Sequence, residues 1–247
     1  GYADTVCVPS ERVYELPESM SFGEGAALVV NYLTAYHMLF NVFRVRPDDH
    51  VLIHQAAGGV GTAALQLCRS VGGVTTYGTA SKRKHDYIRE NGCDHPIDYH
   101  SVDYVEVVRK LTNGRGVDAV LDALGGTDWK KGYALLRPGG LLIPFGWSNM
   151  AKHGQRKITH VLGQLTHLPW WTPMSLMHEN RGVAGVNMGH LWDEKEMMAE
   201  AFTRLLGLYE AGAIKPHVDR SFSFEEASAA HAYIEAGENV GKVLLTP

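Results

Sequence analysis

The sequence contains little cysteine and no large excess of either charge. Its three cysteines, Cys7, Cys68 and Cys93, are too few and too far apart for a disulfide framework or a cysteine-rich zinc site. We therefore expect reduced thiols and a cytoplasmic location. The formal net charge is only −4, and lysine and arginine are spread along the 247 residues, so no basic footprint for nucleic acid is present. A small-molecule site is expected instead.

Long uninterrupted apolar runs are also absent. The most apolar stretch, residues 26–43, is interrupted by polar residues such as Asn31 and Asn41. Because crossing a bilayer takes about 18 to 20 apolar residues, we expect no transmembrane segment. The chain begins at Gly1 without a signal-peptide pattern, and residues 1–8 predict a strand that enters a folded domain. We therefore expect sequence to be missing before Gly1.

Short apolar segments alternate with helical segments over most of the chain. A capping box, Ser21 to Glu24, is expected to open a helix that reaches about Phe43. The expected strands comprise residues 50–54, 74–77, 96–98, 117–122, 141–145 and 183–187. The expected helices between them comprise residues 60–71, 81–91, 103–111 and 127–136. Six short strands with crossover helices predict an α/β fold with a doubly wound, parallel Rossmann sheet.

The pattern changes after the fifth of these strands. Residues 148–179 are rich in histidine, tryptophan and proline, and such an insertion could line a substrate pocket or a dimer contact, with packing alone as an equal alternative. The elements expected further on are a helix over residues 193–210, a strand near Ser221, a helix over residues 224–235 opened by a second capping box, Ser223 to Glu226, and a strand over residues 242–246. They are no longer β-α-β units, which predicts a return to another domain.

A glycine cluster stands where the first of the six strands ends and a helix begins. In the run from His54 to Gly61, the residues Ala56, Gly58 and Gly61 occupy the three positions of the dinucleotide-binding fingerprint. The middle glycine lets the backbone approach a pyrophosphate, and the helix N-terminus adds free N–H groups and a positive dipole. A merely tight turn is the alternative. The predicted cofactor-binding residues in this run are Ala57, Gly58, Gly59, Val60 and Gly61.

The next strand ends without an acidic residue. No aspartate or glutamate lies between Asp49 and Asp86, although an NAD site places an acid about 20 residues after the glycines to bind the ribose 2′-OH. Thr79, Ser81 and Lys82 stand there instead, followed by two more cations. Hydroxyl groups and cations suit a 2′-phosphate, which predicts NADPH as the cofactor. The alternative is a solvated basic helix start, although cations are disfavoured there unless an anion is bound.

Five short motifs carry a family resemblance. They lie at residues 31–36, 57–61, 92–99, 136–140 and 239–243, the last reading Asn-Val-Gly-Lys-Val. Together they resemble the zinc-independent quinone oxidoreductase branch of the medium-chain dehydrogenase/reductase superfamily, over essentially all 247 residues. Residues 95–100, 214–217 and 239–245 are most similar to the vesicle amine transport protein homologues within that branch.

The resemblance implies roles for individual residues. Lys82 and Tyr99 would hold the adenosine 2′-phosphate, and Thr34 would lie near the nicotinamide ribose. From the residues alone, Thr34 could instead bond to its own helix backbone, and Tyr99 could be a packed aromatic. The residues that would border the nicotinamide are Phe145, Gly146 and Trp147. The further cofactor contacts that the resemblance implies are Leu124, Gly125 and Lys242.

The resemblance also implies a division into domains. Residues 1–27 would end the first part of a GroES-like, β-rich catalytic domain, residues 28–190 would form an NADP-binding Rossmann domain, and residues 191–247 would return to the catalytic domain. No catalytic residue can be assigned, because the proton donors of the family lie largely outside this sequence. We expect a homodimer.

Thirteen histidines raise the question of zinc. Zinc-dependent relatives carry a cysteine four residues before the equivalent of Thr34, where this sequence has Val30, and their Cys-x-x-Cys lobe is absent. The histidine-rich stretch offers no acid or cysteine to complete a tetrahedral set around His153, His160, His167 and His178. We therefore expect no metal.

These features predict hydride transfer from NADPH to a quinone or an α,β-unsaturated carbonyl compound, without zinc. One alternative is a reductase-like protein that binds NADPH and acts through protein partners or peripheral membrane contact. A zinc-type alcohol dehydrogenase is the other alternative.

Overall fold

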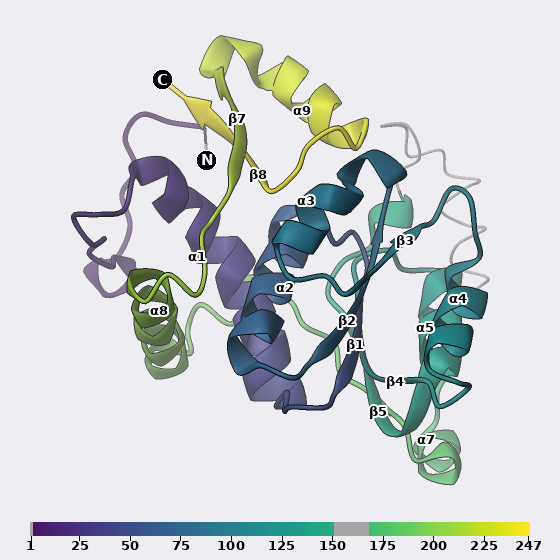
Figure 1. The fold of residues 1–247 in the computed structure, drawn as a ribbon. Helices are drawn as coiled ribbons and strands as arrows, with labels where there is room; N and C mark the ends of the chain where they lie inside the picture. The colour runs from purple at the N-terminus through teal and green to yellow at the C-terminus, as the bar shows by residue number, and fades with distance from the viewer. Residues whose placement is uncertain (1, 151–167) are drawn as a thin grey trace.

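The computed structural model describes residues 2–150 and 168–247, and a six-stranded parallel sheet lies at its centre (Figure 1). The strands are β1 (His50–Ile53), β2 (Thr75–Ala80), β3 (His95–Asp98), β4 (Val117–Asp122), β5 (Leu136–Pro144) and β6 (Gly182–Val183). Their order is β3-β2-β1-β4-β5-β6, and every neighbouring pair is parallel. This confirms the predicted doubly wound class. The chain changes direction across the sheet between β1 and β4, where α/β proteins of this class bind ligands.

Helices cover both faces of the sheet (Figure 1). The first face carries α1 (Phe22–Tyr36), which continues as a π-helix to Phe43, with α2 (Gly59–Val71) and α3 (His85–Glu90). The second face carries α4 (Tyr104–Leu111) and α5 (Thr127–Leu135). Along β1, Val51 and Ile53 pack on the first face and Leu52 on the second. Burial on both faces explains why the strands are continuous apolar runs.

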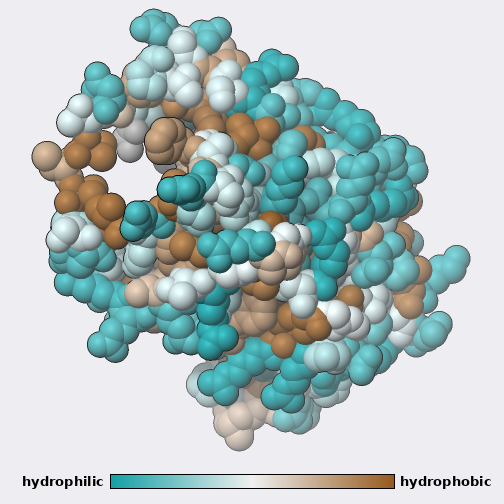
Figure 2. Space-filling model, turned by 60° about the vertical axis from the view of Figure 1, so that its left-hand side comes forward, coloured by the Kyte–Doolittle hydropathy of each residue, from teal (hydrophilic) through white to brown (hydrophobic). Residues whose placement is uncertain are grey.

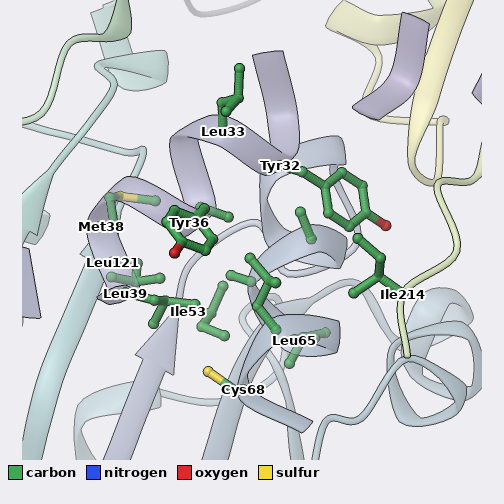
Figure 3. Packing of buried hydrophobic residues seen from close by; sticks show 14 of the residues in the cluster. Tyr32, Leu33, Tyr36, Met38, Leu39, Ile53, Leu65, Cys68, Leu121 and Ile214 are labelled. Atoms are coloured by element: carbon green, nitrogen blue, oxygen red, sulfur yellow. The ribbon is translucent and has the colours of Figure 1, made fainter. Parts of the chain in front are cut away.

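The larger core lies between α1, α2 and the sheet (Figure 3). Tyr32 and Leu33 from α1, Leu65 from α2 and Ile53 from β1 are almost completely buried there. The Tyr32 hydroxyl donates to Gln66 Oε1 at 2.7 Å, so its polar end is satisfied inside the core. Burial raises the pKa of the Cys68 thiol to about 12, which is expected of an unreactive structural cysteine.

The helix of residues Phe22–Phe43 is, by length and composition, apolar enough to cross a membrane, and no other helix among the described residues is. Its most apolar window is 56% buried inside the protein. Tyr32, Leu33 and Met38 of this helix lie in the core of Figure 3, so packing accounts for the apolar residues on its buried side.

After β6 the chain forms α8 (Lys195–Glu210), which packs into the same core as α1, and then β7 (Val218–Ser223), α9 (Ala227–Glu235) and β8 (Lys242–Thr246). β7 pairs with β8 in a separate parallel sheet. Both predicted capping boxes are present, Ser21 with Glu24 and Ser223 with Glu226. The helices and strands predicted here are therefore confirmed.

Apolar side chains of the N-terminal segment are exposed. Tyr2, Val6 and Phe22 are 62%, 63% and 90% exposed, and Figure 2 shows apolar side chains around an opening on the side of the molecule that it brings forward. A cavity of about 340 Å³ lies between residues 11–16, the first turns of α1, and α8. Ion pairs join Arg12 to Asp193 and Lys195 to Glu11 at its edge.

Several predictions of secondary structure were wrong. Residues 2–8 form no strand, because no other segment among the described residues pairs with their backbone, and a strand without a partner is unstable. β6 (Gly182–Val183) contains only Val183 of the expected residues 183–187, whereas β5 begins at Leu136, five residues earlier than expected. Inside the stretch taken as irregular, α7 (Pro173–Glu179) is capped by Thr172. Threonine followed by proline is a helix-start signal that the sequence interpretation missed.

Candidate functional site

The glycine cluster lies at the carboxyl end of β1, next to the switch point of the sheet. Backbone hydrogen bonds tie this turn to both neighbouring strands: His54 N–H donates to Leu121 O at 3.1 Å, and Ala56 N–H donates to Thr79 O at 3.0 Å. Gln55 has a positive φ of 52°, and Gly58 N–H donates back to Gln55 O at 2.9 Å. The turn is therefore held rigidly before α2 begins.

The glycines of this turn differ in what surrounds them. A Cβ atom on Gly61 would lie 2.4 Å from Gln55 O and 2.6 Å from Ala56 Cα, and one on Gly59 would lie 2.3 Å from the Asn31 side chain. A Cβ on Gly58 would meet only Gln55 O, at 3.3 Å. Gly61 is thus required for helix and strand to pack, whereas Gly58 borders free space. These are the two roles that the dinucleotide fingerprint assigns to its last and middle glycines.

The N-terminus of α2 can accept an anion. Gly58 is its N-cap residue and has no side chain to bond the first N–H groups of the helix. In a 13-residue helix these groups and the helix dipole together favour a phosphate. The residues Ala57 to Gly61 therefore form a cradle that fits a pyrophosphate.

The C-terminal part of the chain contacts this cradle. Gly241 N–H donates to Ala57 O at 2.8 Å, and Gly241 forms a parallel bridge with Gly58. The adjacent Lys242 is partly buried, and burial lowers the pKa of its ammonium group. No carboxylate among the described residues forms an ion pair with Lys242.

Three cations follow the end of β2, and two of them have partners. The Arg83 guanidinium forms an ion pair with Glu238 and donates to Gly237 O at 3.0 Å, and Lys84 Nζ donates to Asn239 O. Lys82 is exposed, and its ammonium group has no hydrogen bond or ion pair with any residue that the structure describes. It is therefore the cation of this group that is most available to a ligand.

The other residues predicted to bind the cofactor near the end of β2 lie in different environments. Tyr99 is 52% exposed and is close enough to Arg83 to contribute, after the Glu238 hydrogen bond, to the raised pKa of that guanidinium. Ser81 is the partly exposed residue before the short helix of residues Lys82–Lys84. Thr79 is buried, and its hydroxyl lies 3.1 Å from His54 Nδ1. The Thr79 hydroxyl thus points into the core.

The residues predicted to border the nicotinamide follow β4 and β5. The N–H groups of Leu124 and Gly125 donate to Asp122 Oδ1 at 2.6 and 3.0 Å. Gly125 has a φ of +80°, and a Cβ there would lie 2.2 Å from Trp147, so only glycine fits against this indole. Phe145 N–H donates to Asp122 O at 2.9 Å, with Gly146 between it and Trp147. Leu124, Gly125, Phe145, Gly146 and Trp147 therefore form one cluster.

Thr34 is buried in α1, and its hydroxyl donates to Val30 O at 2.7 Å. This is the backbone bond that the sequence left open as an alternative. Thr34 is one helical turn beyond Asn31, whose side chain contacts Gly59. α1 therefore lies next to the glycine turn. The Thr34 hydroxyl, however, already donates its proton to Val30 O.

Two buried polar side chains at the same edge were missed by the sequence interpretation. His54 directly follows β1 and Asp122 ends β4, and they are 1% and 0% exposed. Neither His54 Nε2 nor Asp122 Oδ2 has a hydrogen-bond partner among the described residues. Burial lowers the pKa of His54 and raises that of Asp122. The sequence contained a signal that these two side chains lie together. Each is a polar residue where a buried strand ends, and adjacent parallel strands end side by side.

Zinc ligands do not come together in the part of the chain that the structure describes, since no three histidine, cysteine, aspartate or glutamate side chains form a cluster there. His178 is exposed at the end of α7, and Val30 is 46% exposed on α1. His153, His160 and His167 lie outside the described residues. The described donors therefore do not fit a zinc ion.

Comparisons with known proteins identify relatives over the whole chain. A family model described as zinc-binding dehydrogenase matches residues 91–245. The synaptic vesicle membrane protein VAT-1 homolog of Rattus norvegicus is 44% identical, over 100% of this chain and 61% of its own length. A 2-haloacrylate reductase from Burkholderia sp is 29% identical, over 100% of this chain and 70% of its own length. The chain thus spans about three fifths of the vesicle proteins that it matches.

Solved structures share the fold. The human synaptic vesicle membrane protein VAT-1 homolog-like protein has a TM-score of 0.81 at 36% identity, over 98% of this chain and 68% of that one. Escherichia coli quinone oxidoreductase complexed with NADPH has a TM-score of 0.83 at 27% identity, over 96% of this chain and 69% of that one.

The names of the vesicle relatives contradict our prediction of a cytoplasmic location, because they are synaptic vesicle membrane proteins. That prediction rested on a low cysteine count. Cysteine usage reports the redox state of the compartment that a protein faces, and it does not report whether the protein is attached to a membrane.

Proposed function

Because the chain belongs to the zinc-binding dehydrogenase family of the medium-chain dehydrogenase/reductase superfamily, we propose that it binds NADPH at the carboxyl edge of its sheet and serves in hydride transfer to a quinone or an α,β-unsaturated carbonyl compound. Family membership confirms the resemblance that the sequence motifs carried. The observation that supports the proposal best is the contrast between the two glycines, since Gly61 is closed in by backbone and Gly58 is open.

The residues at the carboxyl edge of the sheet can be matched to the pyrophosphate, the 2′-phosphate and the nicotinamide of NADPH. The backbone of residues 57–61 and the ammonium of Lys242 would hold the pyrophosphate. Ser81, Lys82 and Tyr99 would hold the 2′-phosphate, and we do not assign Thr79 a direct contact because its hydroxyl faces His54. The cluster of residues 124–125 and 145–147, with α1 near Thr34, would enclose the nicotinamide.

The bound cofactor supplies the hydride, so the protein must position it, exclude water and stabilise negative charge on the substrate oxygen. Trp147 and Phe145 present apolar rings at the nicotinamide end, and Asp122 holds the backbone turn of residues 124–125 in place. E. coli quinone oxidoreductase is complexed with NADPH, and the Burkholderia relative is named for haloacrylate, an α,β-unsaturated acid. Both support this substrate class.

We propose the same division of the chain that the resemblance implied. Residues 28–190 form the cofactor domain, and residues 1–27 and 191–247 belong to one second domain with the further sequence of a longer protein. The exposed apolar residues Tyr2, Val6 and Phe22 support this, because exposed apolar clusters mark surfaces that something else covers. We also propose that the protein forms a homodimer.

The protein that contains this sequence should oxidise NADPH when a simple quinone such as 1,4-benzoquinone is added. The absorbance of the reduced nicotinamide measures turnover, and calorimetric titration measures binding. A second candidate function is NADPH binding without catalysis at a vesicle membrane, which the names of the relatives favour. Tight binding of NADPH with no turnover on quinones or enones would support that second function and contradict the first.

Lys82→Ala should weaken binding of NADPH selectively. Lys82 has no partner among the described residues, so its ammonium is available for a charge-assisted hydrogen bond to the 2′-phosphate, and loss of that bond should cost about 1 to 3 kcal/mol. NADH affinity should change little. Lys110→Ala, which removes an exposed lysine from α4, is the matched control for net charge. An equal loss for NADPH and NADH would argue against a 2′-phosphate site at Lys82.

A further inference from the structure

The loop of residues 237–241, between α9 and β8, lies across two parts of the proposed cofactor site. At one end Gly237 and Glu238 bind Arg83, and Asn239 O accepts a hydrogen bond from Lys84. At the other end Gly241 N–H bonds Ala57 O in the glycine turn. One loop therefore joins the cation group after β2 to the cradle before α2.

Glu238 presents a carboxylate to Arg83, the cation that follows Lys82 in the sequence. Its Oε2 pairs with the Arg83 guanidinium, and carboxylates and phosphates bind a guanidinium through the same charged hydrogen bonds. The Arg83 and Glu238 side chains are 51% and 43% exposed, so a ligand in solution can reach this pair. The hydrogen bond to Arg83 lowers the pKa of Glu238, which is therefore ionised at neutral pH.

We propose that Glu238 is a specificity determinant that competes with the 2′-phosphate of NADPH for Arg83. The inference rests on the proposed NADPH function. Without cofactor, Glu238 neutralises Arg83 and holds the loop of residues 237–241 in place. A 2′-phosphate bound at Lys82 competes with this carboxylate for the Arg83 guanidinium, while Gly237 O and Asn239 O can keep their hydrogen bonds to Arg83 and Lys84.

NADH lacks the 2′-phosphate and does not compete with Glu238. The carboxylate thus lowers the affinity for NADPH while leaving the affinity for NADH almost unaffected, because electrostatic interactions between exposed groups fall off within about 8 Å at physiological salt. Glu238 reduces the preference for NADPH that Lys82 and Arg83 would otherwise produce.

The test is calorimetric titration of the full protein and its Glu238→Gln variant with NADPH and with NADH. Glutamine keeps the size of the side chain and removes its charge. NADPH affinity should rise about two- to fivefold, from the loss of one exposed ion pair, and NADH affinity by less than about twofold. Glu225→Gln removes an exposed carboxylate near the start of α9 that forms no ion pair with any described residue, and it should change neither affinity.

A double-mutant cycle separates competition from a general effect of charge. In an Arg83→Gln background, Glu238→Gln should no longer raise NADPH affinity. An unchanged or lower NADPH affinity in Glu238→Gln would overturn the inference while leaving NADPH binding established. An equal gain for NADPH and NADH would also overturn it. Absence of NADPH binding in the wild-type protein would instead refute the proposed function itself.

Discussion

Gly58→Val is expected to raise the dissociation constant for NADPH by at least about 100-fold, roughly 2.7 kcal/mol, while the chain stays folded. Gly58 has φ −77° and ψ 174°, which valine adopts readily, and a Cβ there meets only Gln55 O at 3.3 Å. The branched side chain would occupy the space in front of the α2 N-terminus that a pyrophosphate needs. Calorimetric titration with NADPH measures the loss.

The folded state of this variant must be verified independently. Its circular dichroism spectrum and thermal unfolding should match those of the wild-type protein. Gly207→Val, on α8 where no atom lies within 4 Å of the added Cβ, is the control and should bind NADPH normally. Undiminished NADPH affinity in Gly58→Val would show that the glycine turn does not bind the pyrophosphate.

Gly61→Ala should have the opposite effect and destabilise the fold itself. The added methyl group would lie 2.4 Å from Gln55 O and 2.6 Å from Ala56 Cα, and both are backbone atoms of a turn held by strands on either side. Because backbone cannot rotate away as a side chain can, we expect a loss of about 3 kcal/mol or more in the free energy of unfolding. Urea unfolding followed by circular dichroism measures it.

A glycine-to-alanine substitution at an uncrowded helical position serves as the control for Gly61→Ala. Gly207→Ala also changes a glycine inside a helix, but nothing lies within 4 Å of the new Cβ. This variant should be about 1 kcal/mol more stable than wild type, because alanine has the higher helix propensity. If Gly61→Ala were as stable as Gly207→Ala, helix and strand would not be packed as closely as the structure shows.

Local patterns allowed much of the fold to be predicted. The capping boxes at Ser21 and Ser223, the buried strand ends and the glycine turn depend on residues within a few positions of one another. Such signals survive in any context that folds, which is why the six strands and most helices were found. The predicted strand at residues 2–8 was wrong because a strand needs a partner, and sequence pattern alone does not reveal whether one is present.

The sequence by itself determined the fold class and the family, and it predicted the region that we propose as the cofactor site. Only the tertiary structure decided how the residues of that region are used. It bonded Thr34 to its own helix and turned Thr79 toward His54. It also paired Arg83 with Glu238, 155 residues away, and left Lys82 without a partner among the described residues. The physical reason is that a side chain's hydrogen bonds depend on what the folded chain brings within about 3 Å of it, and residues far apart in sequence supply those partners.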